Sequence, residues 1–410
     1  MRRLRVVLAA VVVLAWIMGW VHQPMGATAA EPIRVLGLDV LSGPFKDIGE
    51  RYLLGVKFAV DEINDAGGIN GRPIKLYLDD SQLKPDVAQR KATKYILEDG
   101  VKIIMGFTGT HVAKAVAQVA AKHKVVVVQY SAEADELTGK DHVPYVFRLA
   151  LSTSMHAAAT VAAFADKPYK KFYLLNQDYV FGHDVARAYK KYLDKFKPGW
   201  QLVGEEYHPL ATKDFAPYLQ KIIAATPDVV LTGNWGSDLT ILVKQAATFG
   251  VKVPFGHQFL SDPVAMRELG EAAIGHVTSE VYMLGVDTPQ NRTFIERWHK
   301  KFKDTDNPWP EFTIGKAYNT TMFMAAALRK ANSDDADTII RAWEGMAYEG
   351  LVGRQVMRAC DHQVQTPVAV AEIVPGSSRF YAFPFTGPVN LVPAERVSVP
   401  PKETGNKRCE

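Results

Sequence analysis

The sequence predicts an α/β protein with two successive doubly wound lobes, and three observations carry this prediction. Short apolar or β-branched runs alternate with helical segments along most of the chain. The run VVVVQY at 125–130 is almost continuously apolar, as is typical of a parallel strand that helices cover on both faces. The alternation then restarts near Arg148, which indicates a second array of the same kind.

In the first array, the pattern alternates strictly between strand and helix. Strands are expected at 33–40, 74–80, 101–107 and 125–130, and helices at 49–66, 86–98 and 111–123.

The second array repeats this order. Strands are expected at 171–177, 200–207, 228–234 and 253–259, and helices at 153–166, 184–196, 214–225 and 238–249. Helices dominate 290–347, short strands follow residue 350, and the tail VPPKETGNKRCE is expected to be irregular.

The stretch VDEINDAGGINGRPIKL at 60–76 marks a sharp break. Gly67 and Gly68 suit a left-handed helix end, Asn70-Gly71 favours a tight turn, and Pro73 prevents a return to helix. The break is expected to reverse the chain so that strand 74–80 lies parallel to strand 33–40.

The length, composition and charge of the chain restrict the class of protein. A chain of 410 residues with 48% hydrophobic residues is long enough for two or three domains with large cores. Its net charge is +4, and the basic residues are scattered, so nucleic acid is not an expected partner.

The first 30 residues are predicted to be a secretory signal peptide. Met1–Arg5 is positive, Val6–Val21 is apolar and uncharged, and small residues follow, with cleavage expected after Ala29 or Ala30. The alternative is a membrane anchor, but a run of about 16 residues is short for a span. The mature protein is therefore expected to be soluble and periplasmic.

The loops after the strands are the expected binding positions, because ligands of open α/β sheets bind beyond the carboxyl ends of the strands. The loop GFTGTH, with Thr108 and Thr110, is the best candidate, since exposed N–H groups at a helix start suit a carboxylate. The alternative is an ordinary helix cap by either threonine. Aromatic residues at loop tips are expected either to wall an apolar pocket or to fill the core: Phe45, Phe181, Trp235 and Tyr282.

Catalysis and metal binding find little support. The chain has no GxSxG, HExxH, P-loop or GxGxxG after a strand, and its histidines show no metal-ligand spacing. The acidic group Glu133, Asp135 and Glu136 suits either a cation or a solvated loop. We therefore expect no enzyme activity, cofactor or metal.

The two cysteines, Cys360 and Cys409, are predicted to form one disulfide in an exported protein, and two free thiols are the alternative. This bond would join the C-terminal tail to an earlier strand or loop.

Several stretches together resemble the type I periplasmic solute-binding proteins of ABC importers, in the branch that binds leucine, isoleucine and valine. The resemblance covers about 31–375 and rests on these segments: LSGPF, GVKFAVDEINDAGGINGRPIKL, MGFTGTHVAKAVAQVAAKHKVVVVQYSA, NQDYVFGHDVARAYKKYL, ATKDFAPYLQKI, PDVVLTGNWGSD and MRACDHQ.

The resemblance implies two Rossmann-like lobes joined by three crossovers that close on a small ligand. The first lobe would comprise 31–150 plus 283–352, the second 151–282 plus 353–390, and a tail 391–410. The ligand carboxylate would meet Thr110 and Ser131-Ala132-Glu133, and aromatic walls would come from Phe181 and Trp235. The implied partners are the importer's permease subunits, and the implied state is a monomer.

The chain departs from this branch at the fourth strand of the second lobe. Amino-acid binders are expected to carry an acid there for the ligand's ammonium, but the stretch is Gly256-His257-Gln258-Phe259. A buried ammonium without a counter-charge is costly. Either Glu133 takes that role, or the ligand is a small organic acid that Gln258 contacts, which the sequence favours.

Two other functions stay open. The lobes could form a sensory module that acts with a separate receptor, or a secreted hydrolase. An inert response to generic ester and amide substrates would exclude the hydrolase, and neighbouring permease and ATPase genes would favour transport over sensing.

Overall fold

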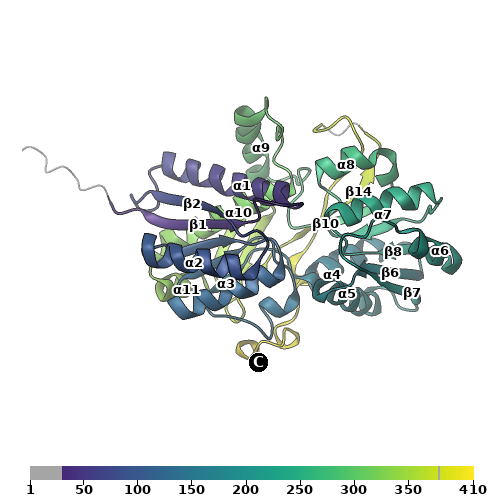
Figure 1. Ribbon diagram of the computed structural model, residues 1–410, viewed down its shortest axis with the longest axis horizontal. Coiled ribbons are helices and arrows are strands. Elements are labelled where there is room, and N and C mark those ends of the chain that lie inside the picture. The colour runs from purple at the N-terminus through teal and green to yellow at the C-terminus, as the bar shows by residue number, and fades with distance from the viewer. Residues whose placement is uncertain (1–29, 377–378) are drawn as a thin grey trace, which may run out of the picture.

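The computed structural model describes residues 30–376 and 379–410, and Figure 1 shows two lobes lying side by side. The predicted signal peptide lies outside the described residues, apart from Ala30. Within the described ranges, no helix combines the length and hydropathy that crossing a bilayer requires.

The first lobe is built on a parallel five-stranded sheet in the order β2-β1-β3-β4-β5. Side chains of α2 and α3 pack on one face of this sheet, and side chains of α1, α10 and α11 pack on the other. The elements of the sheet and its first helices are β1 (Ile33–Asp39), α1 (Lys46–Asp65), β2 (Ile74–Asp80), α2 (Pro85–Asp99), β3 (Ile103–Gly106), α3 (Thr110–His123), β4 (Val126–Gln129) and β5 (Val146–Arg148).

The break after α1 has the predicted conformation. Gly67 and Gly68 have φ angles of 93° and 79°, and Asn70 and Gly71 have φ angles of 50° and 82°. The two-residue turn closes through reciprocal backbone hydrogen bonds of 2.8 and 3.0 Å between Ile69 and Arg72. Because both central residues have positive φ, the turn is of the kind that Asn-Gly favours. It leads directly into β2, which pairs parallel with β1.

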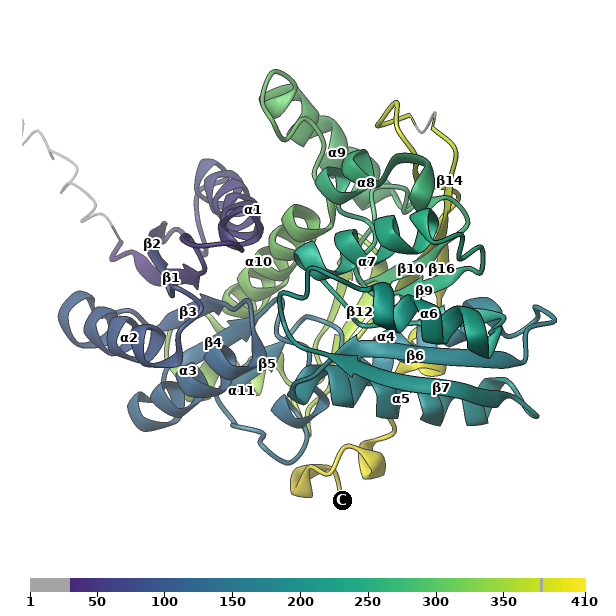
Figure 2. The same cartoon turned by 45° about the vertical axis from the view of Figure 1, so that its right-hand side comes forward.

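The second lobe contains an eight-stranded mixed sheet in the order β15-β14-β10-β9-β8-β6-β7, with β16 also paired to β14. Strands β6 to β10 are parallel, and β14 to β16 join them antiparallel. Figure 2 shows α5 and α7 on opposite sides of this sheet. The elements are α4 (Thr153–Phe164), β6 (Lys171–Gln177), α5 (Val180–Phe196), β7 (Gln201–His208), α6 (Ala216–Ala225), β8 (Val229–Leu231), α7 (Gly236–Thr248), β9 (Phe255–His257), α8 (Pro263–Leu269), β10 (Val277–Glu280), β14 (Val368–Val374), β15 (Phe385–Thr386) and β16 (Asn390–Val392).

The chain returns to the first lobe through α9 (Pro289–Phe302), α10 (Phe312–Ala331) and α11 (Ala336–Trp343). Helix α10 lies directly against α1. A Cβ atom added at Gly55 would lie 2.4 Å from the Ile314 carbonyl oxygen, so glycine permits this close approach. The chain passes between the two sheets three times, at 149–152, 281–288 and 366–367.

The second lobe was expected to resume at residue 353, but residues 347–365 form a small third sheet that packs on the first lobe. Strands β11 (Ala347–Gly350), β12 (Gly353–Met357) and β13 (Val364–Gln365) pair with one another. The buried side chains of Met357 and Val364 belong to the first-lobe core, because β12 folds back on β11 as a hairpin. The chain returns to the second sheet at β14. The other predicted lobe boundaries stay predictions.

The tail is more regular than expected. The stretch VPPKETGNKRCE, expected to be irregular, contains two single 3₁₀ turns, Pro401–Glu403 and Lys407–Cys409, and the short helix α12 (Ala394–Val397) precedes it. The predicted disulfide between Cys360 and Cys409 is present.

Candidate ligand-binding site

Aromatic side chains from the two lobes meet where the loops after β1 and β8 face each other. Phe45, at the start of α1, lies 4.6 Å from Trp235, measured between ring centroids. Trp235 precedes α7, and its Nε1 donates a hydrogen bond of 2.9 Å to the Tyr179 hydroxyl. Both half-buried rings were predicted at loop tips, and the structure brings them together across the lobes.

An ion pair makes a second contact between the lobes. Arg51 of α1 donates two hydrogen bonds, of 3.0 and 2.7 Å, to the Asp262 carboxylate, which also caps α8. The Arg51 Nε lies 3.7 Å from Glu311, just before α10. Burial would lower the pKa of Arg51, but the two carboxylates outweigh it and raise that pKa. The structure is therefore a closed arrangement of the lobes.

In the first lobe, the buried Asp39 organises the GFTGTH loop. Its carboxylate accepts hydrogen bonds from the Thr108 backbone N–H at 3.0 Å and the Tyr130 hydroxyl at 2.9 Å. Burial raises the pKa of Asp39 although these bonds, and the nearby Thr108 hydroxyl, oppose that shift. Gly109 precedes α3 without a side-chain cap, so neither threonine caps that helix. Thr108 faces Asp39, and Thr110 remains half-buried at the helix start.

Four buried charged or polar side chains meet at the junction of the lobes, and we name them the quartet: Glu133, His156, Glu280 and Lys316. The Lys316 Nζ lies 2.9 Å from a Glu133 oxygen and 3.0 Å from a Glu280 oxygen. The His156 Nε2 lies 3.2 Å from the other Glu133 oxygen. Glu133 and Lys316 come from the first lobe, and His156 and Glu280 come from the second. The quartet therefore ties the lobes together.

The quartet has two carboxylates for one lysine. Burial would raise the pKa of Glu133, but Lys316 and His156 lower it overall. Burial raises the pKa of Glu280, and the neighbouring Glu133 adds to that rise while Lys316 opposes it. Burial would lower the pKa of Lys316, but the two carboxylates raise it well above its ordinary value. One carboxylate therefore holds its charge against the lysine, and the other favours its proton.

Glu133, His156 and Glu280 are spaced closely enough to hold a metal ion, because one ligand atom of each lies within 4.8 Å of the others. Lys316 already contacts both carboxylates. With both carboxylates ionised, the cluster has one negative charge more than Lys316 neutralises; a monovalent cation would balance that charge, whereas a divalent ion would exceed it. The quartet suits a monovalent cationic group better than a metal.

A row of aromatic rings connects the contact between the lobes to the quartet. From Tyr179 the ring centroids lie 5.9 Å to Phe181, 6.3 Å from there to Phe259, and 5.6 Å from Phe259 to His156. This row gives the second lobe an apolar wall that ends at buried charges.

The other predicted site residues lie in different surroundings. Ser131 is half-buried near the Tyr52 hydroxyl, and Ala132 is buried beside it. Gln258 is fully buried and approaches the Tyr189 hydroxyl of α5. Tyr282 is fully buried against Gly315 of α10, where an added Cβ would lie 2.1 Å from its ring, so it fills the core.

The acidic group around Glu133 does not converge on one point. Asp135 accepts hydrogen bonds from the Ser154 backbone N–H and hydroxyl, at 3.0 and 2.5 Å. Glu136 pairs with Lys114 and, at 3.2 Å, with Lys140. Only Glu133 belongs to the quartet.

Sequence reasoning missed several members of the site. Lys316, His156 and Glu280 each lie in a segment without another Asp, Glu, Lys, Arg or His nearby, and that isolation was the available signal. Arg51 and Asp262 lie 211 residues apart, so no local pattern joins them.

Comparison with known proteins identifies the family and the fold. The Periplasmic binding protein family matches residues 32–378. The Brucella abortus Leu/Ile/Val-binding protein homolog 4 is 29% identical over 362 residues, which cover 84% of this chain and 85% of that protein. The Pseudomonas aeruginosa leucine-, isoleucine-, valine-, threonine- and alanine-binding protein is 23% identical, covering 79% and 85% of the two chains.

Solved structures share the same fold. The closed conformation of a Brucella ovis leucine-, isoleucine-, valine-, threonine- and alanine-binding protein has a TM-score of 0.83 and 26% identity, covering 90% of this chain and 97% of that one. A Rhodopseudomonas palustris solute-binding protein in complex with 3,4-dihydroxybenzoic acid has a TM-score of 0.79 and 23% identity, covering 90% and 99%. The family binds solutes, is not an enzyme family and implies an extracytoplasmic location. The chain therefore belongs to the periplasmic binding protein family and is a substrate-binding protein of the ABC transporter type.

Proposed function

We propose that this protein captures an apolar α-amino acid between its lobes and delivers it to the membrane subunits of an ABC importer. The observation that carries the proposal is the aromatic row, which runs from Phe45 and Trp235 at the contact between the lobes to the buried quartet. An apolar wall that ends in fixed charges suits a small solute with one apolar and one polar end.

The two polar ends of an amino acid have complementary groups in the site. The ligand carboxylate would meet the first-lobe loops with Thr108, Thr110, Ser131 and Ala132, where helix α3 begins. The ligand ammonium would supply the positive charge that the quartet lacks for Glu133 and Glu280.

Glu280 changes the choice between a small organic acid, which the sequence favoured, and an amino acid whose ammonium meets Glu133. Glu133 alone was the expected ammonium partner, but Lys316 already pairs with it. Glu280 is a second carboxylate at the same lysine, so an amino acid no longer leaves its ammonium without a partner. The names of the leucine-, isoleucine- and valine-binding relatives support the same class of ligand. The rival is an aromatic acid without an amino group, as in the dihydroxybenzoate complex.

Closure of the lobes would couple binding to transport. The contacts Phe45–Trp235 and Arg51–Asp262 exist only when the lobes meet, so ligand that bridges the lobes favours this form in proportion to its differential affinity. The closed form would dock on the permease. We propose that the protein is exported by a cleaved signal peptide, acts in the periplasm and is a monomer.

The test is a thermal-shift screen of the mature protein with branched-chain amino acids, aromatic acids, dicarboxylates and polyols. Ligand at a hundredfold excess over its Kd adds about 2.7 kcal/mol to the free energy of unfolding. We expect leucine, isoleucine or valine to raise the melting temperature. A shift by aromatic acids alone would contradict the ammonium site, and no shift would favour a sensory module with a separate receptor.

A further inference from the structure

The last 18 residues, 393–410, form a segment that we name the C-terminal strap, and its first half is fixed to the second lobe. Val397 is fully buried in the second-lobe core. The Arg396 guanidinium lies 5.2 Å from the ring centroid of Phe196, and Glu403 pairs with Lys191 at 2.6 Å. Both partners belong to α5. Strand β16, directly before the strap, is part of the second sheet.

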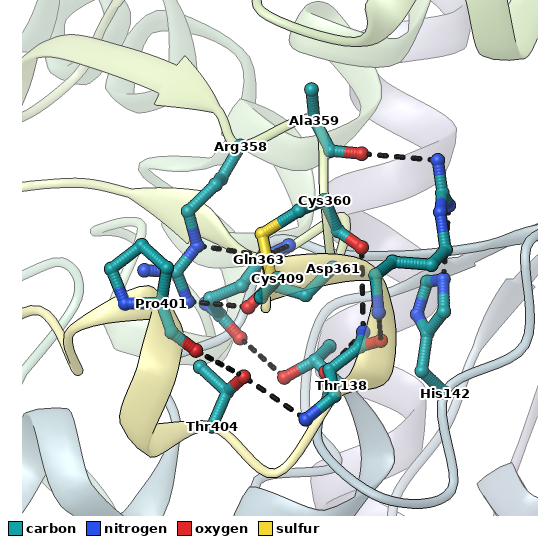
Figure 3. Close-up of a disulfide and its surroundings, with 12 residues drawn as sticks. Thr138, His142, Arg358, Ala359, Cys360, Asp361, Gln363, Pro401, Thr404 and Cys409 are labelled. Carbon is teal, nitrogen blue, oxygen red and sulfur yellow. Dashed lines mark hydrogen bonds and ion pairs between the residues drawn. A yellow bond between two sulfur atoms is a disulfide. The ribbon is translucent and has the colours of Figure 1, made fainter.

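The second half of the strap is fixed to the first lobe. Figure 3 shows the Cys360–Cys409 disulfide among the contacts that surround it. The Asn406 side chain donates a hydrogen bond of 3.1 Å to the Thr138 carbonyl oxygen, and Arg408 donates one of 2.7 Å to Glu344. Cys360 lies between β12 and β13, whose buried side chains belong to the first-lobe core.

Between these two anchors the strap covers a cavity of about 200 Å³. Its walls come from both lobes and from the strap itself, and include Thr138, Ser154, Asp184, Lys191, Glu403 and Thr404. The strap therefore bridges a space at the junction of the lobes instead of packing into a continuous core. Figure 1 shows it at the bottom of the molecule, at the opposite end from α8, whose cap Asp262 pairs with Arg51.

We propose that the C-terminal strap is a fourth connection between the lobes, which limits how far they separate. The chain itself crosses between the sheets three times, and the disulfide closes a further covalent path from β16 of the second lobe to Cys360 of the first. An opening movement that separates α5 from Cys360 must either extend the 3₁₀ turns of the strap or remove it from one lobe. The strap thus favours the closed arrangement and narrows the range of open ones.

This inference rests on the lobe movement of the proposed function, but its first test needs no ligand. Small-angle X-ray scattering would be recorded for the ligand-free mature protein and for two samples without the disulfide. One is the variant Cys409→Ser, and the other is folded wild-type protein that has been reduced with dithiothreitol. Circular dichroism would verify that both remain folded. We expect a larger radius of gyration and maximum dimension in both samples.

Two further variants test whether the strap restrains the lobes or only stabilises the fold locally. Asn406→Ala/Arg408→Ala keeps the disulfide but removes the polar contacts to the first lobe, and we expect a smaller increase in the radius of gyration. Lys221→Ala removes the pair with Glu206 inside the second lobe and should leave the scattering unchanged. A lower melting temperature with unchanged scattering in Cys409→Ser would overturn the proposal.

Ligand affinity provides the second readout. With any ligand from the thermal-shift screen, Cys409→Ser should bind about fivefold more weakly or worse, because closure loses a restraint. Equal affinity together with equal scattering would overturn the strap. A failed ligand screen with increased scattering would instead contradict the proposed function and leave the strap supported.

Discussion

Replacing Lys316 by methionine should destabilise the protein by about 3–5 kcal/mol at neutral pH, which is typical of breaking a buried ion pair. The Lys316 Nζ lies within 2.9 and 3.0 Å of two carboxylates, and all three side chains are at most 4% exposed. Methionine fills a similar volume, so the loss reports charge more than packing. The free energy of unfolding would be measured by urea titration of the mature protein, followed by circular dichroism.

The cost of Lys316→Met should depend on pH, and the pKa shifts of Glu133 and Lys316 set the direction of that dependence. In the wild type the pKa of Glu133 is lowered, so its contribution is complete above about pH 4.5 and is lost only as the pH falls through the lower folded value. The pKa of Lys316 is raised, so its contribution is complete below about pH 10.5 and is lost above it. Between about pH 5 and 7 neither contribution changes in the wild type.

The variant behaves differently in the same window. Without Lys316, burial raises the folded pKa of Glu133 and raises that of Glu280 further than in the wild type, so the variant gains more stability than the wild type as protons bind. The penalty of Lys316→Met should therefore shrink between about pH 7 and 5. Glu280→Gln is the matched control, because it keeps the Glu133–Lys316 pair and should cost about 1 kcal/mol or less. A loss below about 1 kcal/mol in Lys316→Met, or a penalty independent of pH, would contradict a stabilising buried ion pair at Lys316.

Three further predictions concern the binding site. Trp235→Ala should weaken ligand binding by about 10- to 100-fold in calorimetry, since it removes the wall that meets Phe45, whereas the exposed Phe249→Ala should leave affinity unchanged. Arg51→Met should weaken binding by about tenfold or more, because it removes a pair between the lobes, and Arg72→Ala, which removes a pair within the first lobe, should not. Amino-acid binding should release more protons as the pH is lowered from neutral, seen as a buffer-dependent heat, because a ligand ammonium lowers the raised pKa of Glu280; no dependence on the buffer at any pH would argue against that contact.

Periodicity predicted most of the fold because the elements are amphipathic or continuously apolar. The strand at 74–80 and the strand at 171–177 have the expected bounds, and the Asn70-Gly71 turn has the expected geometry. Helix α5 begins at Val180, four residues before the expected start, because Tyr179 already provides the extended residue before the helix. Val180 is exposed although it is apolar, so the first turn of α5 does not show the apolar spacing of an amphipathic helix.

The candidate site was less accessible to sequence reasoning, because its charged contacts join distant residues. Glu133 and Lys316 lie 183 residues apart, and a lone lysine in a helix gives no sign of its partner. The loop tips Phe45 and Trp235 were found, because strand ends of an α/β sheet have a known position. Tyr282 was named for the same reason, yet it fills the core against Gly315.

The ammonium site at the quartet is tested by calorimetric titration of the mature protein with leucine and with 4-methylpentanoate, which lacks only the amino group. Leucine should bind, and 4-methylpentanoate should bind about tenfold more weakly or worse, because it leaves Glu280 without a cation. Equal affinities would contradict the ammonium site at the quartet. Binding of neither compound, together with a negative ligand screen, would contradict the account of an amino-acid receptor.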